Sequence, residues 1–158
     1  MLALFYPAAD APHISLTLRK EYAGVHSGQV SLPGGRVETG DTSLLMTALR
    51  ETEEEIGVPA ADVELLGRLT ELYIPASHFH VFPFVGAVRQ RPDFIPEAKE
   101  VQAIIEVSLQ ELKRDEIIRE KEFLVGDKRL LRAPYFDIQG HVVWGATAMI
   151  LSELLYLV

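Results

Sequence analysis

The first third of the chain alternates short apolar runs with residues that favour turns. The runs Leu2–Tyr6 and His13–Leu18 predict two strands, because a stretch rich in proline and alanine separates them. A third short strand is predicted over Gln29–Leu32, where Pro33-Gly34-Gly35 ends it. We therefore expect the chain to open with small β-elements joined by tight connections.

The apolar positions then change from the period of a strand to that of a helix. Asp41, Thr42 and Ser43 offer helix-capping side chains before a segment free of glycine and proline. On a wheel of about 100° per residue, one side of this helix carries Leu45, Ala48, Leu49, Thr52 and Ile56. A neighbouring side carries Glu51, Glu54 and Glu55, and the helix is predicted to end at Gly57 and Pro59.

The rest of the chain predicts mostly strands and closes with a helix. Strands are expected over Val63–Leu72, His80–Arg89 and Val101–Val107, and a short helix over Leu109–Arg114. Two hairpins follow, Glu122–Val125 with Arg129–Leu131 around Gly126-Asp127, and Tyr135–Ile138 with His141–Trp144 around Gln139-Gly140. The last helix is predicted over Ala146–Leu157. We predict a single domain over residues 1–158 with an α/β (α+β) fold, an α/β/α sandwich with a mixed β-sheet between helices.

Composition narrows the classes of function. The chain has 158 residues, 48% of them apolar, which is enough for one domain with a sizeable core. It contains no cysteine, so disulfides, thiolate metal sites and cysteine nucleophiles are excluded. The formal net charge of −8 argues against a nucleic-acid polymer as partner. We expect no signal peptide and no membrane span, and we expect the protein to be cytoplasmic.

Three carboxylates on the first predicted helix carry the candidate chemistry. Glu51 and Glu55 are four residues apart and Glu51 and Glu54 are three apart, so all three can approach one point. Like charges at this spacing repel each other unless a divalent cation neutralises them, and Mg²⁺ prefers carboxylate and phosphate oxygens. Taken alone, Glu53-Glu54-Glu55 would form an ordinary solvated helix face, and Arg50 with Glu54 an ordinary surface pair.

The segment Gly34–Val58 resembles the Nudix box, in which Gly, five residues and Glu precede seven residues and Arg-Glu-aliphatic-x-Glu-Glu-x-Gly-aliphatic. The matching residues are Gly35, Arg50, Glu51, Glu54, Glu55, Gly57 and Val58. Three features differ: Asp41 replaces the first Glu, Thr52 replaces the aliphatic residue, and the gap from Asp41 to Arg50 is one residue longer. The resemblance implies a Nudix-type fold and a Mg²⁺- or Mn²⁺-dependent enzyme that cleaves a diphosphate bond.

The longer gap is similar to that of the coenzyme A pyrophosphatase branch of the family. Leu16–Gly35, Glu100-Val101 with Glu106–Leu109, and Val143–Ala148 also resemble that branch, although Gly24 stands where the branch carries an arginine. The resemblance implies hydrolysis of coenzyme A or a derivative to 3′,5′-ADP and a 4′-phosphopantetheine product. Three alternatives stay open: another substrate such as ADP-ribose, a dinucleotide or a nucleoside triphosphate, a binding module without turnover, and a purely structural domain.

The resemblance also suggests roles for individual residues. Glu51, Glu54 and Glu55 are expected to hold the metal ion, and Arg50 to position them. The candidates for the general base are Glu54, Glu55, Glu97 and Glu100, of which Glu100 fits the branch and is favoured. The predicted substrate contacts are Arg19, Arg36, Gly34 and Gly35, whereas Phe79 and Trp144 are assigned to the core. The expected partner is a small nucleotide derivative, and a homodimer remains open.

Overall fold

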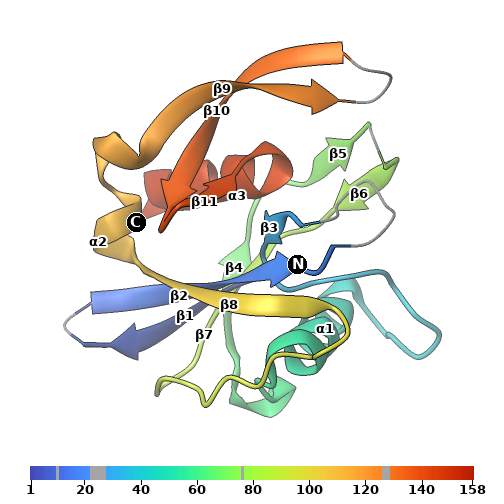
Figure 1. The fold of residues 1–158 in the computed structure, drawn as a ribbon. Helices are drawn as coiled ribbons and strands as arrows, with labels where there is room; N and C mark the ends of the chain where they lie inside the picture. The colour runs from blue at the N-terminus through green and yellow to red at the C-terminus, as the bar shows by residue number, and fades with distance from the viewer. Residues whose placement is uncertain (10, 22–27, 76, 126–128) are drawn as a thin grey trace.

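The computed structural model describes residues 1–9, 11–21, 28–75, 77–125 and 129–158 (Figure 1). Its largest element is a six-stranded sheet of β1 (Leu2–Ala8), β2 (Ala11–Arg19), β3 (Val30–Ser31), β4 (Glu64–Arg68), β7 (Phe84–Ala87) and β8 (Val101–Ser108). β1 pairs antiparallel with β2 and parallel with β7, so the sheet is mixed as the sequence predicts.

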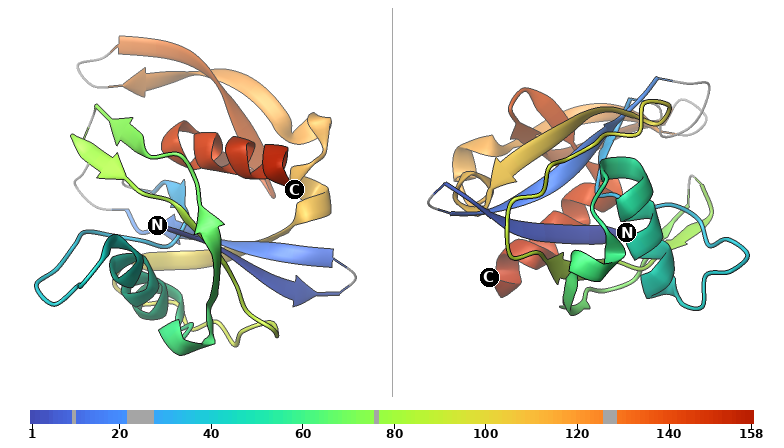
Figure 2. Two further views of the ribbon diagram at one scale, coloured as in Figure 1. Left: turned by 180° about the vertical axis from the view of Figure 1, so that it is seen from behind. Right: turned by 90° about the horizontal axis from the view of Figure 1, so that it is seen from below.

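The helices and two smaller sheets surround this sheet. β5 (Leu72–Ile74) and β6 (Phe79–Val81) form a hairpin, and β9 (Ile118–Val125), β10 (Arg129–Ile138) and β11 (His141–Val143) form a three-stranded sheet. The helices are α1 (Leu44–Ile56), α2 (Leu109–Leu112) and α3 (Gly145–Leu157), with 3-10 turns at Ala60–Asp62 and Asp115–Ile117. α1 and α3 lie on opposite faces of the large sheet (Figure 2), which confirms the predicted sandwich.

β1 shows why each face of the sheet needs a helix. Successive side chains of a strand point to opposite faces, and β1 buries residues of both sets, Leu2, Leu4 and Tyr6 on one face and Ala3 on the other. Leu2, Leu4 and Tyr6 pack in one core cluster with Ala48 and Ile56 of α1. Ala3 belongs to the other cluster, to which α3 contributes Ile150, Leu151 and Leu154.

The two long strands predicted over Val63–Leu72 and His80–Arg89 are wrong, because each run forms two short strands. β4 ends at Arg68 and β5 begins at Leu72, while β6 ends at Val81 and β7 begins at Phe84. The N–H and hydroxyl of Thr70 donate to the Glu153 carboxylate of α3, at 3.0 and 2.9 Å, instead of joining a strand. Pro83 interrupts the second run because it has no N–H to donate.

The two predicted hairpins share one strand. Arg129–Leu131 and Tyr135–Ile138 both belong to β10, which pairs with β9 from Arg129 opposite Val125 to Phe136 opposite Ile118. The turn predicted at Gln139-Gly140 is confirmed, with φ of 54° and 83° at the two residues. The turn predicted at Gly126-Asp127 lies outside the described residues. Within the described ranges, no helix is long and apolar enough to cross a membrane.

Candidate active site

α1 begins and ends at residues that cap it. The Ser43 backbone is extended, and its hydroxyl accepts the Met46 N–H at 3.1 Å. At the other end Gly57 adopts a left-handed φ of 75°, and its N–H donates to the Glu53 carbonyl at 2.9 Å. These caps fix the helical register that places the carboxylates of α1 beside the loop preceding the helix.

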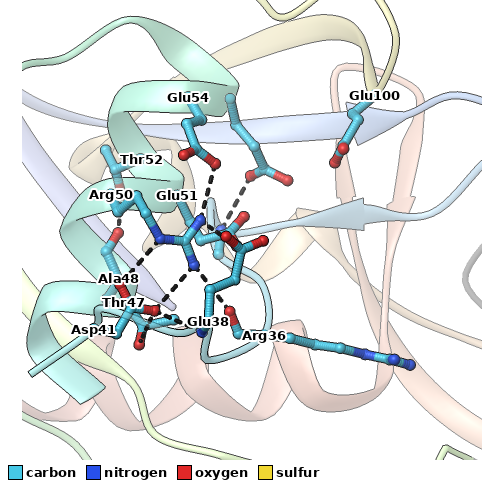
Figure 3. Close-up of polar contacts among 12 residues, drawn as sticks. Arg36, Glu38, Asp41, Thr47, Ala48, Arg50, Glu51, Thr52, Glu54 and Glu100 are labelled. Carbon is cyan, nitrogen blue, oxygen red and sulfur yellow. Dashed lines mark hydrogen bonds and ion pairs between the residues drawn. The ribbon is translucent and has the colours of Figure 1, made fainter. Parts of the chain in front are cut away.

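Asp41 and Arg50 join this loop to the helix (Figure 3). Asp41 Oδ1 accepts Arg50 Nε at 3.1 Å, and Oδ2 accepts Arg50 Nη2 at 3.1 Å. Oδ2 also accepts the Thr47 hydroxyl and the Glu38 N–H, both at 2.9 Å. The Arg50 guanidinium holds the pKa of Asp41 well below its usual range. Arg50 Nη2 donates in addition to the Arg36 carbonyl at 2.9 Å, so one guanidinium orders both the loop and the helix.

These contacts explain how the chain accommodates two of its differences from the Nudix box, Asp41 and Thr52. Aspartate is one methylene shorter than glutamate, yet Asp41 still reaches Arg50 with both oxygens across the longer gap. Thr52 is fully buried at the position of the aliphatic residue, and its hydroxyl donates to the Ala48 carbonyl at 2.7 Å. That bond satisfies the hydroxyl within the helix, so threonine is accommodated in an apolar contact.

Glu55 is the buried carboxylate of the site. Its side chain is 4% exposed, and Oε2 accepts the Gly34 N–H at 3.0 Å while Oε1 lies 3.5 Å from Arg19 Nη1. Burial raises the pKa of Glu55 from 4.5 to about 7, against the opposing effects of Gly34 and Arg19. A carboxyl that is costly to ionise in this position becomes favourable to ionise once a cation is beside it.

Glu51 and Glu54 contact Arg50 and not each other. Arg50 Nη1 lies 3.0 Å from Glu51 Oε1 and 2.9 Å from Glu54 Oε2. Over the part of the chain that the structure describes, no three acidic or histidine side chains form a closed group around one point. The Glu54 side chain is 58% exposed, whereas the Glu51 side chain is 13% exposed. The donors of the site are therefore carboxylate oxygens of one buried, one nearly buried and one exposed glutamate, a set that suits a hard divalent cation.

The two glycines before the helix leave room for this set. A Cβ on Gly35 would overlap the Glu51 carboxyl, and a Cβ on Gly34 would approach the Met1 Cα to 2.6 Å. Gly34 also has a φ of 151°, which side chains rarely adopt. The glycines therefore let the backbone contact the carboxylates directly, and Gly34 does so through its N–H.

Arg19 connects the helix to the loop before β8. Its Nη2 lies 4.0 Å from Glu100 Oε2, and its Nη1 is the group that faces Glu55. The Glu100 carboxylate is 58% exposed and points toward the carboxylates of α1 (Figure 3). Glu97 differs, because its carboxylate accepts the Lys99 N–H at 3.0 Å. Of the two loop carboxylates, the geometry favours Glu100 for chemistry at the helix.

The side chain of Arg36 lies apart from the other predicted site residues. Its carbonyl bonds to Arg50, but its guanidinium lies over the Phe79 ring, 4.7 Å from the centroid, and extends away from Glu51 and Glu54 (Figure 3). Sequence reasoning assigned Phe79 to the core and gave Thr47 no part in the site. Thr47 stands three residues before Arg50 on the same helix face, so its spacing could have indicated a shared partner. Gly24 lies outside the described residues.

Comparisons with known proteins agree with this arrangement. A family model described as the NUDIX domain matches residues 4–125. An uncharacterised Nudix hydrolase, NudL, of Yersinia pestis (strain Pestoides F) is 35% identical over 144 residues, covering 90% of this chain and 71% of the relative. NudL of Yersinia pseudotuberculosis serotype O:3 (strain YPIII) has the same identity and coverage.

Solved structures share the fold at lower identity. An Ap4A hydrolase of C. elegans is 19% identical with a TM-score of 0.58, over 69% of this chain and 78% of that one. A MutT NUDIX hydrolase of Burkholderia pseudomallei is 18% identical with a TM-score of 0.55, over 97% of this chain and 95% of that one. At these identities the likeness concerns the fold alone.

Proposed function

Because this chain belongs to the Nudix hydrolases, we propose that it hydrolyses the diphosphate bond of coenzyme A or of a coenzyme A derivative. Family membership makes it a pyrophosphatase that acts on a nucleoside diphosphate derivative. The choice of coenzyme A is carried by the box, in which eight residues and not seven separate Asp41 from Arg50, and the stretches Leu16–Gly35 and Val143–Ala148 point the same way. The expected products are 3′,5′-ADP and a 4′-phosphopantetheine compound.

Nudix hydrolases generally use divalent cations, and the carboxylates of α1 fit such an ion. Glu51, Glu54 and Glu55 would hold Mg²⁺ or Mn²⁺, which supplies polarisation of the diphosphate oxygens and charge neutralisation when bound. Arg50 orders Glu51 and Glu54 through its Nη1 contacts, and its pair with Asp41 fixes the guanidinium in that place. In this proposal the glutamates bind the cation and Arg50 orients them.

We assign the proton transfer to Glu100. Its exposed carboxylate faces the helix, and an ionised carboxylate beside the site can accept a proton from the attacking water. Arg19 lies between Glu55 and Glu100, where its charge is available to a phosphate oxygen of the substrate. The space beside Gly34 and Gly35 is filled by Met1 and the Glu51 carboxyl, so these glycines would support the site by bringing backbone close to its carboxylates. Arg36, over Phe79, would contact a more distant part of the substrate.

The test is product analysis with coenzyme A, ADP-ribose and a dinucleotide in parallel, with Mg²⁺ or Mn²⁺, for the wild type and Glu54→Gln. Glu53→Gln is a matched control, because the Glu53 carboxylate accepts the Ala60 N–H at 3.1 Å and an amide oxygen can do the same. We expect coenzyme A to be cleaved by the wild type and Glu53→Gln, and Glu54→Gln to lose most activity. Preference for another substrate would contradict the coenzyme A assignment, and absence of turnover with every substrate would favour a binding module.

A further inference from the structure

The segment of residues 89–100 joins β7 to β8 and passes the C-terminal end of α1 (Figure 1). It contains no helix or strand, and only its last residues form a turn. A connection of this length without regular structure is usually mobile unless other contacts hold it. Three sets of contacts hold this one, and two of them involve residues of the active site.

Arg91 makes the first set of contacts, with Glu106 of β8. Its Nε donates to Glu106 Oε2 at 2.9 Å and its Nη2 to Oε1 at 2.5 Å, a two-point arrangement that fixes orientation as well as distance. Glu106 Oε2 also accepts the hydroxyl of the buried Tyr6 at 2.9 Å. The Phe94 ring meets Tyr6 edge-on at 5.2 Å and lies 5.6 Å from the Arg91 guanidinium. These groups anchor the start of the segment to the sheet.

The second set of contacts joins the segment to the last turn of α1. The Ile95 N–H donates to the Ile56 carbonyl, and the Glu97 N–H donates to the Glu55 carbonyl, both at 3.0 Å. Carbonyls in the last turn of a helix have no partner within the helix, so the segment supplies one. The fit is close, because a Cβ on Gly57 would lie 2.9 Å from the Ile95 Cβ. The residue whose backbone is held here, Glu55, is the buried carboxylate of the site.

The third set of contacts places Glu100. The Glu97 carbonyl accepts the N–H of Glu100 at 3.1 Å and the N–H of Val101 at 2.9 Å. The Glu100 carbonyl in turn accepts the Lys20 N–H at 2.9 Å. Glu97 therefore contacts α1 with its N–H and starts the turn that carries Glu100, so a displacement of Glu97 would move Glu100 relative to Glu55.

From these contacts we propose that Arg91 is a positioning residue of the active site. Its pair with Glu106 anchors the 89–100 segment, and the anchored segment holds Glu100 in register with Glu55. The inference rests on the proposed function, since it requires Glu100 to act in the reaction. Arg91 is 48% exposed, and an ion pair this exposed contributes little to stability by itself, so its effect is expected in catalysis.

The test compares Arg91→Ala and Arg91→Lys with Arg132→Ala. Arg132 is a matched control because it also pairs with a glutamate, Glu120 at 2.9 Å, on the exposed sheet of β9 and β10. We expect Arg91→Ala to lower kcat by about 10- to 100-fold while KM for coenzyme A stays within about 2-fold. Lysine donates from one point instead of two, so Arg91→Lys should recover part of the loss. Arg132→Ala should behave as the wild type.

A double variant shows whether Arg91 acts through Glu100. In a Glu100→Gln background, Arg91→Ala should lower kcat by less than about 2-fold further, because the group that it positions is already lost. Independent losses that multiply in the double variant would overturn the proposal. So would a wild-type kcat in Arg91→Ala at a temperature where the variant is folded.

Hydrogen exchange separates this proposal from the proposed function. The amides of Ile95 and Glu97 should exchange faster in Arg91→Ala than in the wild type, and should not change in Arg132→Ala. Unchanged exchange at both amides in Arg91→Ala would refute the anchoring step. If the wild type cleaves none of the diphosphates offered, the proposed function has failed, and the exchange result still decides whether Arg91 anchors the segment.

Discussion

Replacing the buried carboxyl of Glu55 by an amide should stabilise the protein at alkaline pH when no metal is present. Glutamine has nearly the same shape and keeps an oxygen that can accept the Gly34 N–H, now 3.0 Å from Glu55 Oε2. It carries no charge, so the free-energy cost of ionising a buried carboxylate disappears. The variant also loses the contact with Arg19 at 3.5 Å, which is too long to offset much of that cost.

The magnitude follows from the pKa of Glu55, which burial raises from 4.5 to about 7. At about 1.4 kcal/mol per pH unit, this difference corresponds to about 3 kcal/mol, an upper value because the site relaxes. A carboxyl whose pKa is raised on folding binds its proton more tightly in the folded state. Its stabilising effect is complete below about pH 4.5 and is lost as the pH rises through about 7. We therefore expect Glu55→Gln to gain about 2 kcal/mol at about pH 8.5 and almost nothing at about pH 5.

The assay is thermal unfolding of the wild type and Glu55→Gln in a chelator, from about pH 5 to about pH 8.5. For a chain of this size, about 2 kcal/mol corresponds to an increase in Tm of about 6 °C. Excess Mn²⁺ should reverse the order, because the ion binds the folded wild type more tightly than the variant. Glu53→Gln, at an exposed neighbouring position, should show neither effect. A metal-free Glu55→Gln that is less stable than the wild type at alkaline pH would refute the reasoning.

Three further substitutions test the rest of the site. Gly35→Ala should lower kcat by about 100-fold with little change in Tm, because its Cβ would overlap only the end of the Glu51 side chain and would displace that carboxyl; steady-state kinetics and a melting curve decide this. Asp41→Asn should lower the urea midpoint at neutral pH, because the pKa of Asp41 is depressed by Arg50. That difference should begin to shrink as the pH falls below the ordinary pKa of aspartate and should be lost only as the pH falls through the depressed pKa of the folded state. A difference that does not shrink at all in acid would contradict the assignment. Thr52→Val should change the free energy of unfolding by less than about 1 kcal/mol in urea titrations, since it removes one bond within the helix and keeps the packing.

The helix that carries the candidate site could be predicted almost residue by residue. Ser43 and Gly57 cap α1 where the sequence offers capping residues, and the spacing of the glutamates follows from the helical period alone. The ends of the strands after this helix were harder to predict, because they depend on groups that are distant in the sequence. Thr70 leaves the sheet to bond with Glu153, 83 residues away, and no local pattern announces such a partner.

The sequence by itself determined which groups are available to the candidate site. These are three glutamates at helical spacing, an arginine before them and two glycines that allow close approach of the backbone. These features depend on residues within a turn or two of each other, so composition and spacing suffice to specify them. Only the tertiary structure decided that Glu55 is buried against the Gly34 N–H, that Glu100 faces the helix, and that Arg36 turns to Phe79. Burial and electrostatic environment are set by groups that folding brings together from distant parts of the chain. Their effects on pKa, orientation and proton transfer therefore appear only in the folded protein.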